Sequence, residues 1–259
     1  MTATAASPAP ARAPGSRAVT VAAALVSIAT AVTLLVIAVL PLLTLVFIHP
    51  ALDASSSAAW LGMTPEQAHV LSDRTVHELV FGPGSFAFAG PDGAPFYQAD
   101  EAAHLHDART LLFLFLGLGV VCAAAVSARL LMVRGNARRD AWRAVARGGS
   151  GLVVGVVALG IVGFLAFEPA FELFHEIFFP GGNWAFDPST SHMVQLYPYL
   201  FWQITAGTLG AIAAALGLLT WWLARSRMRE LPTTAGVTLD SGDDARHTAA
   251  LTPGTRGGR

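Results

Sequence analysis

Long apolar stretches alternate with polar segments along the chain, and the apolar stretches have the lengths of membrane-spanning helices. Roughly 20 apolar residues cross a bilayer as a helix, and four stretches meet that requirement, at about 18–48, 110–133, 149–167 and 199–224. The pattern predicts an all-α membrane protein whose four transmembrane helices form one domain over 18–224. The first stretch exceeds the apolar region of a signal peptide, roughly 7–15 residues, and we expect it to tilt or kink near Pro41.

The polar segment 49–109 contains two predicted helices. Over 64–81, Thr64 is a suitable N-cap, Pro65 suits the first helical position and Gln67 completes a capping box. Apolar positions cover one side of this helix, which predicts an amphipathic helix on the membrane surface with His69 and His77 on its solvated face. A second helix is expected over 98–110, running directly into the second span. Between them, the turn-rich residues 82–96 predict a loop or a small hairpin.

Composition and charge agree with a membrane location and predict an orientation. The chain is 54% hydrophobic and 13% charged, with mean hydropathy +0.55, and all its basic residues are arginine. The only basic residues in segments 49–109 and 168–198 are Arg74 and Arg109. The positive-inside rule therefore places both segments outside the cell and both termini in the cytoplasm. The ends, 1–17 and 225–259, have the composition of disordered segments. The lone Cys122 excludes an internal disulfide.

Candidate chemistry gathers in the two polar segments. Glu101, His104 and Asp107 are spaced three residues apart and share one helix face. The second polar segment repeats the spacing with Glu172 and His175, on a helix expected to extend the third span outward. A carboxylate beside a histidine fixes its tautomer and raises its basicity, as a general base requires. The alternatives are a polar helix end for the first group and an aromatic interfacial belt for the second.

A metal site is the third possibility for these residues. Di-iron carboxylate bundles use a Glu-x-x-His from each of two helices and a glutamate from each of two others. The first and fourth spans offer no such inward glutamate. We therefore predict no metal and no other cofactor.

The two blocks together resemble a known family. "EAAHLHDART" before the second span and "FHEIFF" with "NWAFDP" before the fourth are similar to the lipoprotein intramolecular transacylase (Lit) family of four-span bacterial membrane proteins. The resemblance covers roughly 20–224. It implies an enzyme of the bacterial cytoplasmic membrane that faces outward, acts on diacylglyceryl lipoproteins, and moves the sn-2 acyl chain onto the α-amine of their N-terminal cysteine. The family's two functional histidines match His104 and His175.

The expected roles follow from that reaction. His104 would be the general base, oriented by Glu101 or Asp107, and His175 would bind the ester carbonyl or share the proton relay. Substrate contacts are expected from Glu172, Phe178, Phe179, Trp184 and Asp187. No nucleophilic side chain is required when amine and ester belong to one substrate. The partners expected are lipoproteins and membrane lipids, with no nucleic acid.

Two other functions stay open at this stage. One is a metal-dependent membrane hydrolase or oxidase that uses the same histidines and acids. The other is a non-enzymatic envelope protein whose outer segments bind lipid or a partner protein, with histidines that respond to external pH.

Overall fold

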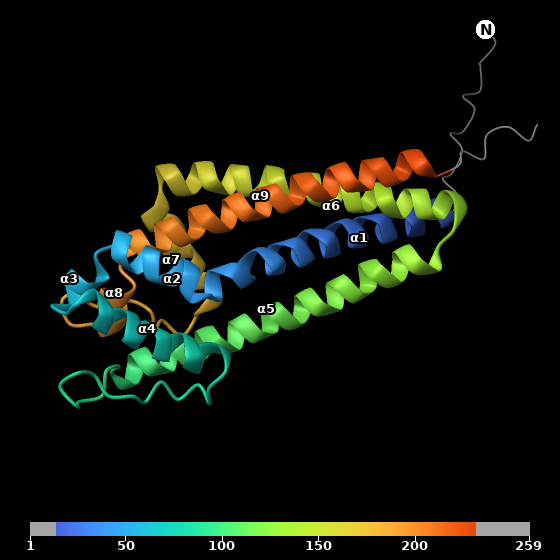
Figure 1. Cartoon of the computed structure of the whole chain (residues 1–259). Coiled ribbons are helices and arrows are strands. Elements are labelled where there is room, and N and C mark those ends of the chain that lie inside the picture. Colours follow the sequence, from blue (N-terminus) through green and yellow to red (C-terminus); the bar gives the residue numbers. More distant parts are fainter. Residues whose placement is uncertain (1–13, 232–259) are drawn as a thin grey trace, which may run out of the picture.

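Four long helices run side by side along the molecule in the computed structural model, which describes residues 14–231 (Figure 1). Each is long and apolar enough to cross a membrane. They are α1 (Pro14–Val39), α5 (Ala99–Met132), α6 (Gly135–Leu165) and α9 (Tyr199–Glu230). The predicted all-α fold with four apolar spans is therefore confirmed.

The first span is broken where the sequence predicted a kink. α1 gives way to a short 3-10 helix, η1 (Leu40–Leu43), which contains Pro41. Thr44 then adopts an extended backbone before α2 (Leu45–Ala54). Proline lacks the N–H that would continue the hydrogen-bond ladder and its ring crowds the preceding turn, so the chain leaves the direction of α1 at this point.

Small residues allow the closest helix contacts in the bundle. α6 and α9 form its most extensive pair, and α1 packs against α5, α6 and α9. A Cβ placed on Gly149 of α6 would lie 2.6 Å from the carbonyl oxygen of Gly217 on α9. The two backbones thus touch directly, which the absence of side chains at both positions permits.

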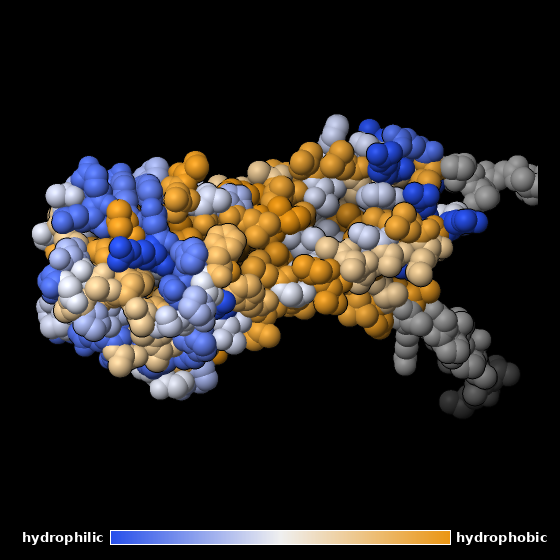
Figure 2. All heavy atoms as spheres, turned by 60° about the horizontal axis from the view of Figure 1, so that its bottom comes forward, coloured by the Kyte–Doolittle hydropathy of each residue, from blue (hydrophilic) through white to orange (hydrophobic). Residues whose placement is uncertain are grey.

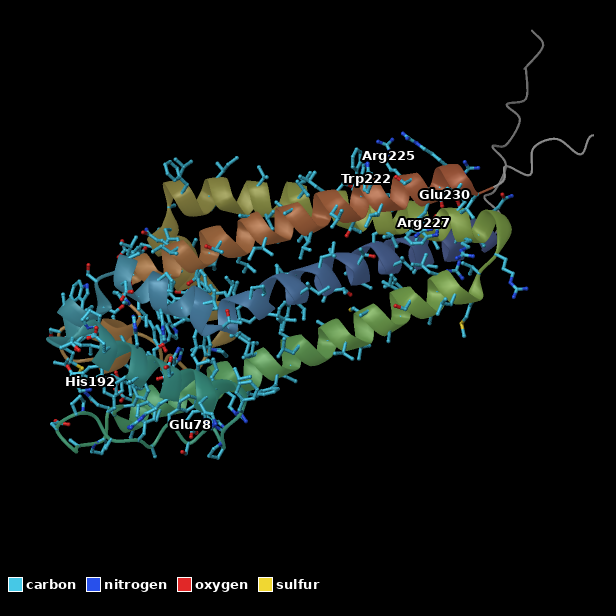
Figure 3. The ribbon with its side chains drawn as sticks, viewed as in Figure 1. Glu78, His192, Trp222, Arg225, Arg227 and Glu230 are labelled. Atoms are coloured by element: carbon cyan, nitrogen blue, oxygen red, sulfur yellow. The ribbon has the colours of Figure 1, made fainter. Side chains whose placement is uncertain are left out.

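Polar surface lies at both ends of an apolar middle. Figure 2 shows the hydrophobic belt between two hydrophilic ends. Figure 3 places Arg225, Arg227 and Glu230 at the end where α9 finishes, and Glu78 and His192 at the opposite end. We call the latter the polar end; it contains α2, α3 (Ser57–Leu61), α4 (Pro65–Val80), α7 (Phe167–Phe178) and α8 (His192–Leu196).

The polar end has its own hydrophobic core. It joins side chains from α2, α4, α8, the start of α9 and the 81–98 loop, and its buried members include Ile48, Leu52, Leu71, Phe86, Phe96, Leu196 and Phe201. In that loop one isolated bridge pairs Ala89 with Pro95, in agreement with the predicted turn-rich segment. Arg109 on α5 donates to the carbonyl oxygens of Glu78, Leu79 and Gly82 and so closes the C-terminus of α4.

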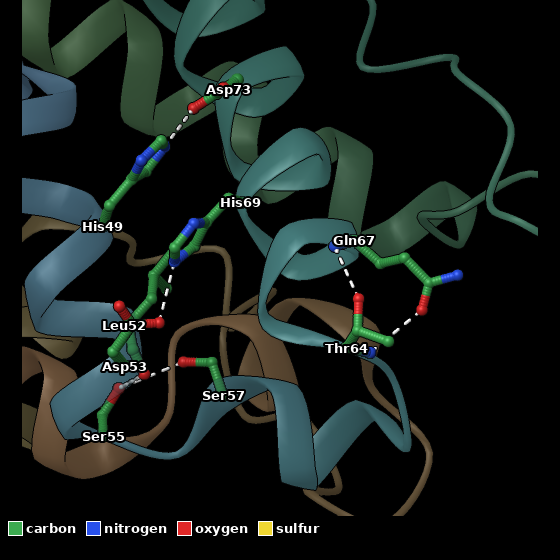
Figure 4. Close-up of polar contacts among 9 residues, drawn as sticks. All are labelled: His49, Leu52, Asp53, Ser55, Ser57, Thr64, Gln67, His69 and Asp73. Atoms are coloured by element: carbon green, nitrogen blue, oxygen red, sulfur yellow. Dashed lines mark hydrogen bonds and ion pairs between the residues drawn. The ribbon is translucent and has the colours of Figure 1, made fainter.

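Helix α4 has the predicted capping box, in which Thr64 and Gln67 bond each other's backbone N–H. Its histidine face is different from the prediction. His69 is half-buried and bonds Asp53 of α2 at 2.8 Å, while His49 of α2 bonds Asp73 of α4 at 2.7 Å (Figure 4). The two imidazoles stack with 4.1 Å between ring centroids. The polar face of α4 therefore lies against α2. Of the two histidines predicted to face solvent, only His77 is exposed.

Three predicted boundaries were wrong. α1 begins at Pro14 and α9 continues to Glu230, with Leu231 as its C-cap, so residues 14–17 and 225–230 are helical. The residues expected to be disordered at 1–13 and 232–259 lie outside the described range. α7 is also not an extension of the third span. α6 ends at Leu165, and Ala166 leaves the helical backbone region at φ −151° and ψ 56°. In a continuous helix the ring of Pro169 would clash with the Leu165 carbonyl.

Candidate functional site

The two histidines singled out in the sequence meet at the polar end. His104 lies on α5, two turns before its apolar stretch, and His175 lies in the last turn of α7. Their ring centroids are 5.9 Å apart and the rings are inclined by 26°. Both side chains are almost fully buried, with 7% and 8% of their surface exposed. The two sequence blocks therefore lie together at the polar end.

Aromatic rings enclose the histidine pair. The Phe179 ring lies 4.5 Å from that of His104 and 5.5 Å from that of His175. Phe186 approaches His104 at 5.8 Å, and Trp184 approaches His175 at 5.2 Å. Water has little access to a site walled in this way, so charge on either imidazole is disfavoured.

Both histidines are held neutral. Burial is the main cause that lowers the pKa of His104 from its ordinary 6.5 to about 4; the neighbouring His175 acts in the same direction and Asp107 opposes them. Burial also lowers the pKa of His175, against a backbone hydrogen bond that raises it. At neutral pH each ring therefore carries one N–H donor and one nitrogen that can accept a proton.

The hydrogen bonds of the two rings differ. Nδ1 of His175 donates to the carbonyl oxygen of Phe171 at 2.8 Å. Because that bond fixes the proton on Nδ1, Nε2 of His175 is the acceptor. Nδ1 of His104 is buried and has no hydrogen-bond partner among the described residues. A buried polar atom without a partner is uncommon in native structures, so this nitrogen is a candidate for a bond to substrate.

The two carboxylates beside His104 do not orient it. Glu101 is 1% exposed and accepts from the backbone N–H groups of Gln98 and Met193 and from the Ser191 hydroxyl. Asp107 accepts from the Asn183 side chain at 2.8 Å. The predicted tautomer-fixing bond to His104 is therefore absent from the described residues. Glu101, His104 and Asp107 do lie on one helix at the predicted spacing. The two carboxylates, however, bond the chain segment that covers His104 rather than His104 itself.

The remaining predicted contacts divide between the wall of the site and the solvent. Phe179 and Trp184 line the histidine pair, as described above. Phe178 is 47% exposed and its ring packs on Phe174. Glu172 is exposed. Asp187 is exposed and accepts from the backbone N–H and the hydroxyl of Ser189, which lower its pKa. Neither acid forms a hydrogen bond to the histidines.

An open groove of about 420 Å³ begins beside the histidine pair. It runs between α5 and the segment after α7, and its walls are mainly apolar: Asp107, Thr110, Leu111, Leu114, Phe178, Phe179, Pro180, Gly181 and Asn183. Phe179 belongs both to the groove and to the enclosure of the histidines. The groove therefore meets the enclosure of the histidines at Phe179 and extends along α5, and neither imidazole lines it.

Sequence reasoning missed several residues of the site. Phe171 fixes the His175 tautomer through its carbonyl, Phe186 closes one side of His104, and Asn183 and Ser191 bind the two carboxylates. A backbone carbonyl leaves no side-chain signal. Asn183 and Phe186 lie inside the "NWAFDP" block, where polar and aromatic residues stand together. For metal binding, no group of three or more histidine, cysteine or acidic side chains is suitably arranged within residues 14–231.

Comparisons with known proteins identify a family and a shared fold. The matching family model, lipoprotein intramolecular transacylase Lit, spans residues 18–202. Three solved structures of the membrane-integral Lit from Bacillus cereus share the fold at 16% identity, and each covers 83% of this chain. The first has a TM-score of 0.69 over 97% of its own chain. The other two, with a histidine-to-arginine and a histidine-to-alanine mutation, score 0.65 and 0.64 over 94% and 96%.

A comparison with curated proteins finds no match. The family model, however, covers most of the chain, including three of the four spans, both polar segments and the start of the fourth span. The chain therefore belongs to the lipoprotein intramolecular transacylase Lit family.

Proposed function

We propose that this protein is a lipoprotein intramolecular transacylase that moves the sn-2 acyl chain of a diacylglyceryl lipoprotein onto the α-amine of its N-terminal cysteine. Family membership supports the class of reaction. The observation that carries the proposal is the buried pair of neutral histidines, one with an acceptor Nε2 and the other with an unpartnered Nδ1. Ester aminolysis needs one group that takes a proton and one that polarises the carbonyl, and this pair can supply both.

The reaction balances without a covalent enzyme intermediate. The cysteine nitrogen attacks the sn-2 ester carbonyl and forms an amide, while the bond from that carbonyl to the glyceryl oxygen breaks. The proton lost by the amine returns to the glyceryl oxygen. Amine and ester are on one molecule, and holding such groups in contact can give effective molarities of roughly 10⁵–10⁸ M. The product is an N-acyl, S-monoacylglyceryl lipoprotein.

The structure favours His175 as the proton carrier and His104 as the carbonyl partner, the reverse of the roles expected from the sequence. The Phe171 bond leaves Nε2 of His175 as an acceptor. Burial lowers the pKa of His104 to about 4, so this imidazole stays neutral. A neutral imidazole can donate a hydrogen bond to a developing oxyanion, where such donors contribute strongly in a water-poor site.

The groove beside the pair suits the acyl chain. Its mainly apolar walls and its position along α5 would let a chain remain in contact with lipid while its ester lies near the histidines. Phe178 and Phe179 border the groove, which supports their predicted substrate role. The arginine distribution supports a site on the outer face of the bacterial cytoplasmic membrane.

Mass spectrometry of lipoprotein N-termini tests the proposal. The protein and its His104→Ala and His175→Ala variants are expressed in a bacterium whose lipoproteins stop at the diacylglyceryl, free-amine stage. His77→Ala is the matched control, because His77 is exposed on α4 outside the site. Lyso-form termini are expected with the wild type and the control, and a loss of about 10²–10⁴-fold with the other two. Unchanged diacyl termini with wild-type protein present in the membrane would overturn the proposal.

A further inference from the structure

The segment 179–191 forms most of the cover of the histidine pair. It begins at the end of α7 and finishes at the N-cap of α8. Phe179, Trp184 and Phe186, all from this segment, surround the two imidazoles. The position of these rings relative to α5, which carries His104, therefore decides the shape of the space in which a substrate would react.

A buried carboxylate attaches the end of this segment to α5. Glu101 lies one turn before His104 and accepts from the Ser191 hydroxyl at 2.5 Å and from the Met193 backbone N–H at 2.9 Å. Its second oxygen accepts from the Gln98 backbone N–H at 2.7 Å. Hydrogen bonds to a charged group are stronger than neutral ones, and 1% exposure keeps water from competing for this carboxylate.

A second carboxylate attaches the segment nearer its start. Asp107 lies one turn after His104 and accepts from the Asn183 side chain at 2.8 Å. This bond is exposed, and both residues line the groove beside the histidine pair. The two acids thus bond the cover on either side of the histidine that they flank in the sequence.

We propose that Glu101 and Asp107 are positioning residues that fasten the segment 179–191 over His104, through Ser191 and Met193 at one end and through Asn183 at the other. Neither acid takes part in proton transfer. The buried Glu101 bonds form a permanent attachment, and the exposed Asp107–Asn183 bond holds the groove side of the cover. This assignment rests on the proposed function for its effect on catalysis, but the attachment itself is measurable without activity.

The first experiment measures the attachment by electron paramagnetic resonance. A nitroxide is placed on Gly181→Cys in a Cys122→Ala background, since a Cβ at Gly181 would meet no described atom within 4 Å. Asp107→Ala, Asn183→Ala and the double variant are expected to raise nitroxide mobility equally, because all three lose the same bond. Glu101→Ala should raise it as well, because it removes the bonds from the Ser191 hydroxyl and the Met193 backbone N–H. Asp100→Asn, an exposed acid on the same helix, is the matched control and should change nothing.

The second experiment measures acyl transfer by the unlabelled variants. A misplacement of about 1 Å can cost roughly 10²-fold in rate, so Asp107→Ala and Asn183→Ala are each expected to lower kcat by up to about that factor with little change in KM. The double variant should be no slower than either. Exchange of the two side chains, Asp107→Asn with Asn183→Asp, restores a donor–acceptor pair and should recover most of the lost kcat.

The outcomes separate the two proposals. If Asp107→Ala is slow while Asn183→Ala keeps normal kcat and normal nitroxide mobility, Asp107 acts through its own charge and the positioning role is wrong. If mobility rises as expected but the wild type shows no acyl transfer, the attachment stands and the proposed function fails. Should Glu101→Ala not fold, Ser191→Ala removes one of the two attaching bonds and is expected to raise mobility less than Asp107→Ala.

Discussion

The depressed pKa values of the histidine pair make a specific prediction for the pH dependence of acyl transfer. Burial lowers the pKa of His104 to about 4 and lowers that of His175 below its ordinary value. The α-amine of the substrate has an ordinary pKa of about 7.7–8.0 and must lose its proton to attack. As the pH falls from 8, the amine is therefore protonated well before His104.

The magnitude follows from these values. At pH 5.5 a histidine with a pKa of about 4 is about 97% neutral, whereas one at the ordinary 6.5 would be only about 9% neutral. His104 therefore adds nothing to the fall that protonation of the amine causes, which is about tenfold in kcat/KM for each pH unit between about 7.5 and 5.5. A histidine of ordinary pKa would make the fall about a hundredfold per unit below pH 6.5.

The assay is initial-rate acyl transfer by purified protein on a synthetic diacylglyceryl peptide, from pH 5 to pH 9. A single inflection near pH 8 with unit slope below it agrees with the structure. A second inflection near pH 6.5, followed by a slope of two, would show that the histidine pair is solvated during the reaction and would refute the reasoning from burial. Recovery of full activity after return to pH 7.5 controls for unfolding.

Three further predictions concern stability. Gly149→Ala should destabilise the bundle by about 1–3 kcal/mol, because its Cβ would lie 2.6 Å from the carbonyl oxygen of Gly217 on α9. Gly155→Ala on the same helix is the control, because a Cβ there would meet no described atom within 4 Å. Thermal unfolding in detergent compares the two variants. A double-mutant cycle of His49→Ala and His69→Ala should give a coupling of about 0.5–1.5 kcal/mol from their stacked rings, and additive losses would contradict that contact. The pKa of His104 is lower in the folded state than in the unfolded state, so the unfolded state binds more protons between pH 6.5 and 4. The free energy of unfolding therefore falls as the pH falls through that window. His104→Gln should remove roughly 2–3 kcal/mol of this loss at pH 4.5, as thermal unfolding at that pH can measure.

Much of the fold could be predicted because its signals are local. Span lengths follow from runs of apolar residues, the break at Pro41 follows from proline geometry, and the α4 capping box lies within the four residues from Thr64 to Gln67. Each depends on residues within a few positions of one another. One local signal, Pro169, would have placed the break between α6 and α7 but was overlooked among the surrounding phenylalanines.

The parts of the site that could not be predicted depend on contacts between distant residues. Spacing of three residues places Glu101 on the face of His104, but it does not say which neighbour the carboxylate meets. Its partners Ser191 and Met193 lie on a different helix some ninety positions away. The pairing of His69 with Asp53 across α2 and α4 is similar. Helical periodicity indicates which side chains share a face and contains no information about what packs against that face.

A crossover experiment tests the central claim, intramolecular acyl transfer by a histidine pair, most directly. Two synthetic diacylglyceryl peptides of different mass, one with deuterated and one with ordinary acyl chains, are mixed with the purified protein. The masses of the products are then determined by mass spectrometry. If transfer is intramolecular, each peptide carries only its own acyl chain on its amine, and His175→Ala forms neither product. Peptides carrying each other's chains, or fatty acid released with the amines unmodified, would contradict it.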